Sequence, residues 1–359
     1  MSLSFEHTTL GQRVLFGSGK AAENLAAETS RLGAGSIMVI ASDFEMPMAR
    51  TVAAGIEVTL WHNEVVMHVP IETAHAARDA ATNARIDLIV CVGGGSTTGL
   101  AKAVALETGI PIIAVPTTYA GSEATNVWGL TEAARKTTGV DDRVLPVTVI
   151  YDAELTLSLP VEMSVASGLN GMAHCIDSLW GPRADPINAA LAAEGIRALA
   201  QGLPKIKNDP AGLPGREQAL YGAYLSAVAF ASAGSGMHHK ICHVLGGTFN
   251  LPHAQTHATV LPYVLAFNAP HAPEAEARAA AAFGADTALG GLQALRELLD
   301  APRALEDYGF TEAGIAEAVE VALPAIPASN PRRVTADNLA ALLTAALNGA
   351  DPKTLTDLS

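Results

Sequence analysis

The sequence predicts an N-terminal α/β domain built on a Rossmann-like parallel sheet, followed by an all-α helical domain. Two observations carry this prediction. In the first 150 residues or so, short apolar runs alternate with amphipathic, Ala-rich stretches, which is typical of a parallel sheet covered on both faces. From about Ser158 onward, strand patterns nearly vanish and helical patterns dominate. We therefore place the domains at residues 1–158 and 159–359, and we expect a ligand site in the cleft between them.

The elements follow in chain order from these patterns. The expected strands are the apolar runs at residues 14–16, 36–41, 57–61, 87–92 and 112–115. Helical stretches are expected at residues 20–32, 43–54 and 71–85 and up to residue 108, with Gly33 and Gly55 ending the first two. In the second domain, helices are expected over residues 185–201, 216–233 and 237–249. A surface loop bearing Gly and Pro is expected at residues 202–215.

The composition restricts the classes of partner and the compartment. The 359 residues include 22 Lys and Arg against 36 Asp and Glu, a formal net charge of −14. Nucleic acids and anionic membranes bind basic surfaces, so this balance argues against both. The three cysteines form no CxxC pair, and the N-terminus lacks the pattern of a signal peptide. The uncharged run at 219–237 is interpreted as a buried helix, and we expect a soluble, cytoplasmic protein.

A run of glycines marks a candidate phosphate site. Gly93, Gly94, Gly95 and Ser96 follow an apolar strand and precede a helix. Glycines there let the backbone approach a pyrophosphate, and the helix N-terminus supplies free N–H groups. The run is not the GxGxxG fingerprint, and a tight turn without a ligand remains the alternative. Residues 116–122 add hydroxyls at the same expected edge of the sheet.

Histidines mark a second candidate site. Five of the 11 histidines lie between residues 238 and 257. His239 and His243 are four residues apart, a spacing that puts both on one helix face, and Asn170 and His174 repeat it. Imidazoles paired in this way commonly bind a divalent metal, whereas the alternative is a set of core histidines. We favour a site that also includes His253, and we interpret His238 and His257 as core residues.

Taken together, these stretches resemble the iron-containing (group III) alcohol dehydrogenase superfamily over essentially the whole chain, and most closely its maleylacetate reductase branch. The resemblance rests on the segments at 93–102, 116–123, 128–139, 168–174, 239–247 and 250–253. It implies the two-domain plan of dehydroquinate synthase-like proteins, with NADH or NADPH and the substrate in the cleft. It also implies that family members are commonly dimers, and we expect a homodimer.

The resemblance also implies roles for individual residues. Gly93, Gly94, Gly95 and Ser96 match the pyrophosphate loop, and Thr117 and Thr118 match cofactor contacts. Metal-dependent members bind iron or zinc through an Asp and three His, and the His positions here are His174, His239 and His253. His243 matches a further histidine near the nicotinamide. The candidate catalytic residues are thus His174, His239, His243 and His253.

Two residues depart from the family pattern. Asn170 stands where the metal-binding Asp is expected, and Gly99 replaces an acid in the helix after the glycines. A neutral Asn oxygen is a weaker ligand than a carboxylate. We therefore expect no metal, and regard Asn170, His174, His239 and His253 as a vestigial set, although three imidazoles could still hold zinc.

The expected activity is NAD(P)H-dependent reduction of the conjugated C=C of maleylacetate to 3-oxoadipate in aromatic compound degradation. The alternatives are a metal-dependent alcohol dehydrogenase of the same superfamily, a dehydroquinate-synthase-like lyase and a non-catalytic nucleotide-binding protein. The first two would be expected to bear a complete metal site, which Asn170 contradicts. Retention of four site histidines speaks against the last.

Substrate and cofactor contacts are predicted from charge. A dicarboxylate substrate needs local positive charge, and Arg binds carboxylates in bidentate fashion. The candidates are Lys240, Arg135 and Lys136, Asn170 being a further substrate contact, and the pair at 332–333 is also considered. Ser42 and Asp43 follow the second strand, where an acid would bind the ribose hydroxyls and repel a 2′-phosphate. With Ser42 at that point, both NADH and NADPH could be accepted.

Overall fold

The computed structural model describes residues 4–132 and 135–356, and of residues 135 and 136 only the backbone. The chain forms two compact units, one spanning Leu10–Leu159 and one that combines the segment ending at Thr9 with the residues from Pro160 onward. The segment before Leu10 therefore belongs with the helical unit, not with the α/β unit in which the sequence placed it. The His7 ring nitrogen Nδ1 and the Asp185 carboxylate, 2.8 Å apart, hold it there.

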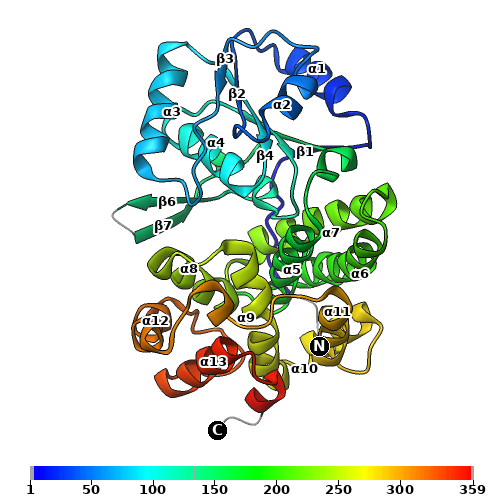
Figure 1. The fold of residues 1–359 in the computed structure, drawn as a ribbon, viewed down its shortest axis with the longest axis vertical. Coiled ribbons are helices and arrows are strands. Elements are labelled where there is room, and N and C mark those ends of the chain that lie inside the picture. The colour runs from blue at the N-terminus through cyan, green and yellow to red at the C-terminus, as the bar shows by residue number, and fades with distance from the viewer. Residues whose placement is uncertain (1–3, 133–134, 357–359) are drawn as a thin grey trace. The chain divides into compact units, whose positions relative to one another are not determined.

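The α/β unit is built on a six-stranded parallel sheet with the order β1-β8-β5-β4-β2-β3 (Figure 1). Its strands are β1 (Arg13–Phe16), β2 (Ile37–Ile40), β3 (Leu60–His62), β4 (Leu88–Gly93), β5 (Ile112–Pro116) and β8 (Thr148–Tyr151). Every residue of β4 is buried, as a strand covered on both faces requires. Because the strands are parallel, the carboxyl ends of β2, β4 and β5 meet at one edge.

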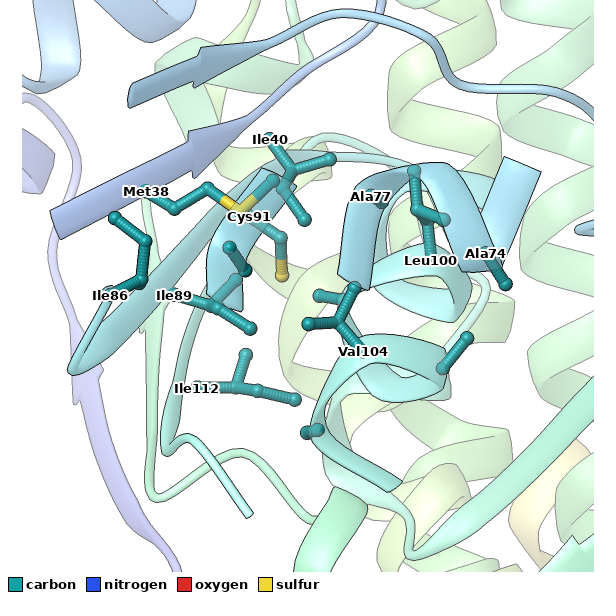
Figure 2. Close-up of a cluster of buried hydrophobic side chains, with 14 of the residues drawn as sticks. Met38, Ile40, Ala74, Ala77, Ile86, Ile89, Cys91, Leu100, Val104 and Ile112 are labelled. Carbon is teal, nitrogen blue, oxygen red and sulfur yellow. The ribbon is translucent and has the colours of Figure 1, made fainter. Parts of the chain in front are cut away.

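Helices cover both faces of this sheet. They are α1 (Ala21–Leu32), α2 (Met46–Val52), α3 (Ile71–Asn83) and α4 (Gly95–Thr108). Figure 2 shows one of the two interfaces, in which Ile89 and Cys91 of β4 pack with Leu100 and Val104 of α4. A second apolar cluster on the opposite face includes Leu25 of α1 and Val52 of α2.

A separate antiparallel hairpin follows β5. It consists of β6 (Val127–Glu132) and β7 (Arg135–Val140), which the sequence pattern did not predict. A Cβ at Gly139 would lie 2.5 Å from the Trp128 ring, so a side chain at this position would displace the indole. The Thr131 hydroxyl donates a 2.8 Å hydrogen bond to the His68 carbonyl, which connects the hairpin to the loop before α3.

One buried lysine joins α4 to the start of the hairpin. Lys102 is 1% exposed, and its ammonium donates to the Thr125 carbonyl, the Thr125 hydroxyl and the Val127 carbonyl at 2.8–3.0 Å. Burial lowers the pKa of Lys102 to about 7, but three acceptors around three donors favour the charged form. This contact fixes the helix that begins at the glycine run.

The second unit is helical (Figure 1). Its helices are α5 (Val161–Ser178), α6 (Pro186–Asn208), α7 (Leu213–Ala233), α8 (Met237–Phe249), α9 (His253–Asn268), α10 (Pro273–Phe283), α11 (Ala288–Leu299), α12 (Ile315–Ala322) and α13 (Ala336–Asn348). Short 3₁₀ helices of the two units are η1 (Ser122–Ala124), η2 (Asp142–Val144), η3 (Ala153–Thr156), η4 (Ala269–His271), η5 (Glu306–Tyr308), η6 (Glu312–Gly314), η7 (Leu323–Ala325) and η8 (Pro352–Leu355). Among the described residues, no helix combines the length and the apolar character needed to cross a membrane.

The surface loop expected at residues 202–215 is mostly helical. Helix α6 continues to Asn208 and α7 begins at Leu213. A Cβ at Gly202 would lie 2.8 Å from the Gly215 carbonyl and the Ala219 amide. The glycines in this stretch therefore allow two helices to pack closely, and they do not mark a loop.

Candidate functional site

The glycine turn joins β4 to α4 in the α/β unit. Gly93 is the last residue of β4 and Gly94 is the N-cap of α4, with Gly95 and Ser96 in the first helical turn. A Cβ at Gly93 would lie 2.5 Å from both the Glu45 carboxylate and the Thr97 hydroxyl. A Cβ at Gly94 would lie 3.0 Å from the Thr118 methyl group. Gly93 and Gly94 therefore leave little room for a side chain.

Hydrogen-bond donors converge at this turn on a single carboxylate. Glu45 accepts from the Gly94 amide at 3.1 Å and from the hydroxyls of Thr117, Ser42 and Thr97 at 2.9, 2.8 and 3.2 Å. Ser42, Gly94 and Thr117 were predicted as cofactor contacts, whereas Glu45 was not singled out. These donors suit an anion, so a pyrophosphate oxygen could take the place that the Glu45 carboxylate occupies.

Gly99, the second departure from the family pattern, has a structural cause. A Cβ at this position would lie 2.9 Å from a Val69 methyl group. Val69 is 5% exposed and has a φ of +50°, an uncommon backbone conformation for a β-branched residue. An acidic side chain at position 99 would have to displace Val69.

The histidine cluster lies in the helical unit and is formed by three helices. Helix α5 carries Asn170 and His174, α8 carries His238, His239 and His243, and α9 carries His253 and His257. The rings of His174 and His239 stack with centroids 4.8 Å apart, and both contact Phe230. His243 lies 6.1 Å from His239, and His253 lies 4.4 Å from His257, between ring centroids.

Asp177, which the sequence argument did not name, orients His239. Its Oδ2 accepts hydrogen bonds from the His239 ring nitrogen Nδ1 at 2.7 Å and from the Gly236 and His239 amides at 3.1 and 3.2 Å. The carboxylate therefore caps the N-terminus of α8 and leaves the His239 lone pair on Nε2. Burial raises the pKa of Asp177 to about 7, although the backbone donors oppose this shift.

Most of the cluster is buried and electrically neutral. Burial lowers the pKa of His174 to about 4 and that of His238 to about 3, and it holds those of His239 and His257 well below their ordinary value. His238 and His257, interpreted as core residues, are fully buried and hydrogen-bonded to each other at 3.0 Å. His243 and His253 are only partly buried, so they are the accessible histidines of the cluster.

The predicted metal-binding side chains do not already lie close enough together to form a ligand cluster. Among the described residues, three ligand atoms of His, Cys, Asp or Glu within 4.8 Å of one another occur only at His238, Cys242 and His257. The nitrogens of that pair of histidines already bond each other. His174, His239 and His253 form no such group, and Asn170 supplies an amide where the family has a carboxylate. No chemical step below depends on a metal.

The residues predicted to bind the substrate carboxylates differ in how exposed their side chains are. Lys240 lies half-buried on α8, between His239 and His243 in sequence. Arg332 is 7% exposed and donates to the carbonyls of Phe267 and Leu355, so it is a structural arginine and not a carboxylate ligand. Arg333 is exposed. The side chains of Arg135 and Lys136 lie outside the described part of the chain.

Family models match both units. Residues 11–153 match iron-containing alcohol dehydrogenase, and residues 164–347 match the C-terminal part of the Fe-containing alcohol dehydrogenase family. The chain belongs to the iron-containing alcohol dehydrogenase family. Members of this family are NAD(P)-dependent dehydrogenases that usually bind iron, which makes the absence of a carboxylate at Asn170 informative.

Individual relatives match over nearly their whole length. A maleylacetate reductase of Sphingobium indicum is 44% identical, covering 98% of this chain and 100% of the relative. The crystal structure of a maleylacetate reductase from Agrobacterium tumefaciens superposes with a TM-score of 0.91 at 39% identity, covering 97% of this chain and 99% of that one. A structure from Corynebacterium glutamicum named iron-containing alcohol dehydrogenase has a TM-score of 0.97 at 71% identity, covering 99% and 100%.

The buried neutral histidines predict that the protein loses stability in mild acid. The unfolded chain binds protons at these residues near pH 6.5, whereas folded His174 and His238 do so only near pH 4 and pH 3. Stability should therefore fall as the pH drops below about 6.5, by about 2 kcal/mol for each of the two histidines at pH 5. Urea unfolding measured from pH 8 to pH 5 checks this.

The variant His238→Asn keeps a polar partner for His257 but removes one of these protonation sites. Its stability should decline less between pH 8 and pH 5 than that of the wild type. The exposed His271 provides the matched control, since His271→Ala should follow the wild-type curve. Equal unfolding free energies at pH 8 and pH 5 would contradict the burial of neutral imidazoles.

Proposed function

We propose that this chain is an NAD(P)H-dependent reductase of the conjugated C=C of maleylacetate, that it forms 3-oxoadipate, and that it needs no metal. The observation that carries the proposal is a set of site histidines beside Asn170, without the carboxylate that a metal centre of this family would use. The maleylacetate reductases described above, which match the chain end to end, support the choice of substrate.

The conjugated ketone of maleylacetate explains why the proposed reduction needs no metal. A reduced nicotinamide held at the glycine turn would supply the hydride for the carbon β to the ketone and would be left as NAD(P)⁺. The C=C electron pair then shifts toward the ketone, so negative charge is spread over an enolate and does not rest on a bare alkoxide. A hydrogen-bond donor aimed at such an oxygen can contribute about 3–4 kcal/mol. Neutral imidazole N–H groups can therefore replace a Lewis acid.

The accessible histidines are assigned to this work. His243 and His253 donate to the developing enolate oxygen. His243 acts as an imidazolium: it transfers one proton to the α-carbon, which completes the reduction, and is left as neutral imidazole that regains a proton from solvent. The His243 ring lies edge-on to His239, which Asp177 orients and which stacks on His174, whereas the His253 ring lies against His257. Lys240, Arg135, Lys136 and Asn170 are proposed to receive the two substrate carboxylates.

The cofactor is proposed to bind at the glycine turn of the α/β unit, with its pyrophosphate on Gly93, Gly94, Gly95 and Ser96, and with Thr117, Thr118 and Ser42 as further contacts. Either NADH or NADPH is accepted. Asp43, which would select against a 2′-phosphate, is exposed and its carboxylate accepts from the Asn63 amide at 2.6 Å. We further propose that the enzyme is a homodimer.

The first test is oxidation of NADH and NADPH by maleylacetate before and after exhaustive chelation. We expect rapid oxidation that survives chelation, because no residue in the proposed mechanism acts through a metal. Activity that disappears on chelation and returns with zinc or iron would restore the Lewis-acid mechanism. If maleylacetate is inert but alcohols or ketones react, the chain is an alcohol dehydrogenase, as the name of its Corynebacterium relative says of that protein.

The second test concerns His243. The change His243→Ala should lower kcat about 100-fold, the usual contribution of a positioned general acid, while changing the Kd for NADH little. The exposed His271→Ala is the control and should retain full turnover. Near-normal turnover of His243→Ala would remove this histidine from the mechanism and leave His253 as the proton donor to examine.

The third test adds the missing carboxylate. Asn170 is 1% exposed and its Oδ1 is buried without a hydrogen-bond partner, so Asn170→Asp changes charge but hardly changes shape. We expect this variant to bind zinc about tenfold or more tightly than the wild type, because a carboxylate restores the anionic ligand. Titration calorimetry and metal analysis measure this. Equal, tight zinc binding by both proteins would show that Asn170 does not prevent metal binding.

A further inference from the structure

The Glu45 carboxylate occupies the centre of the glycine turn. Its Oε1 accepts from the Gly94 amide and the Thr117 hydroxyl, and its Oε2 accepts from the Ser42 and Thr97 hydroxyls. These four donors lie within 2.8–3.2 Å of one side chain. Only one of them, Ser42, is a near neighbour of Glu45 in sequence.

The donors come from three different strands. Ser42 follows β2, Gly94 follows β4 and Thr117 follows β5, while Thr97 lies in the first turn of α4. This edge of a parallel sheet is where phosphate groups of dinucleotides bind, with a backbone N–H at a helix N-terminus and nearby hydroxyls. The carboxylate of Glu45 therefore satisfies the same donors that a pyrophosphate would use.

Two anions cannot share these donors. Each hydroxyl has one proton to donate and the Gly94 amide has one, so a bound phosphate oxygen takes a donor away from Glu45. A carboxylate left beside a pyrophosphate would also add like-charge repulsion in a partly buried place. The dinucleotide can therefore bond these four donors only if the Glu45 carboxylate leaves them.

The surroundings of Glu45 allow it to leave. It is the N-cap residue of α2, a helix of seven residues, and its own amide is bonded to the Ser42 carbonyl at 3.0 Å. That backbone contact does not depend on where the carboxylate points. The side chain is only half-buried, and its neighbour Phe44 is 78% exposed. Rotation about side-chain bonds would therefore carry the carboxylate toward solvent without unfolding the helix.

We propose that Glu45 is a built-in competitor of the cofactor: its carboxylate fills the pyrophosphate site of the free enzyme and must be displaced by NADH or NADPH. This inference rests on the assignment of the glycine turn to the cofactor. The displaced carboxylate opposes binding, and its return to the turn favours release of the oxidised dinucleotide after each turnover. Glu45 thus sets the cofactor affinity without touching the reacting atoms.

The test measures binding and not turnover. Glu45→Gln keeps the length of the side chain but removes the charge and turns one acceptor oxygen into an NH2 donor, whereas Glu45→Ala removes the competitor. NADH fluorescence or calorimetry should give a Kd about tenfold lower for both variants than for the wild type, as loss of one like-charge contact predicts. The matched control is Glu57→Gln, an exposed glutamate of the same unit, which should bind NADH like the wild type.

Inorganic pyrophosphate provides a second readout that needs no nicotinamide. It should raise the Tm of Glu45→Ala well above its effect on the wild type, because only in the variant are the four donors open. Without pyrophosphate, Glu45→Ala should melt at a lower temperature than the wild type, since the same donors lose their acceptor. Circular dichroism of both variants checks that the fold is retained.

The outcomes separate this inference from the proposed function. If both variants bind NADH no better than the wild type, or more weakly, Glu45 does not compete with the cofactor and the inference is overturned. Absence of NADH binding in all proteins would overturn it as well, together with the assignment of the turn. Tighter NADH binding by the variants supports the inference even where maleylacetate proves not to be the substrate.

Discussion

The hydrogen bond from the His239 ring to Asp177 determines the geometry of the histidine cluster. Asp177 sits at the end of α5 and is completely buried, so its carboxylate needs donors from elsewhere in the chain. It finds them at the start of α8, in two backbone amides and one imidazole. Oδ2 of Asp177 therefore caps the N-terminus of α8, links α5 to α8 and fixes the tautomer of His239. The ring contacts with His174, Phe230 and His257 follow from that one orientation.

The two candidate sites handle charge in opposite ways. In the helical unit, burial keeps the imidazoles neutral, and the anionic group is placed behind His239, where it orients and does not ligate. In the α/β unit, the Glu45 carboxylate accepts hydrogen bonds from the Gly94 amide and the Thr117 hydroxyl at the glycine turn. The first arrangement suits a reaction that generates a diffuse negative charge beside hydrogen-bond donors. The second suits a ligand that must bind and leave in every turnover.

The sequence predicts the alternation of strands and helices well, because strands buried on both faces read as continuous apolar runs. It misses β8 and the β6–β7 hairpin, and it misreads Gly202 as a loop signal where helix packing requires a small residue. Asp177 could have been found, since it lies three residues after His174 on the same helix. Glu45 could not, because its partners are brought together only by the order of the strands.

The spacing of Asn170 and Asp177 on α5 bears on the balance of charge in the histidine cluster. Asn170 and Asp177 are seven residues apart on α5, and both are buried with an oxygen that lacks a hydrogen-bond partner. A second carboxylate at position 170 would place two acids on one buried face, with burial already raising the pKa of Asp177 to about 7. A dication would offset that repulsion, but without one the neutral amide is the side chain of the same shape that the helix can bury. In the proposed mechanism, Asn at position 170 therefore avoids a second buried negative charge that no cation would balance.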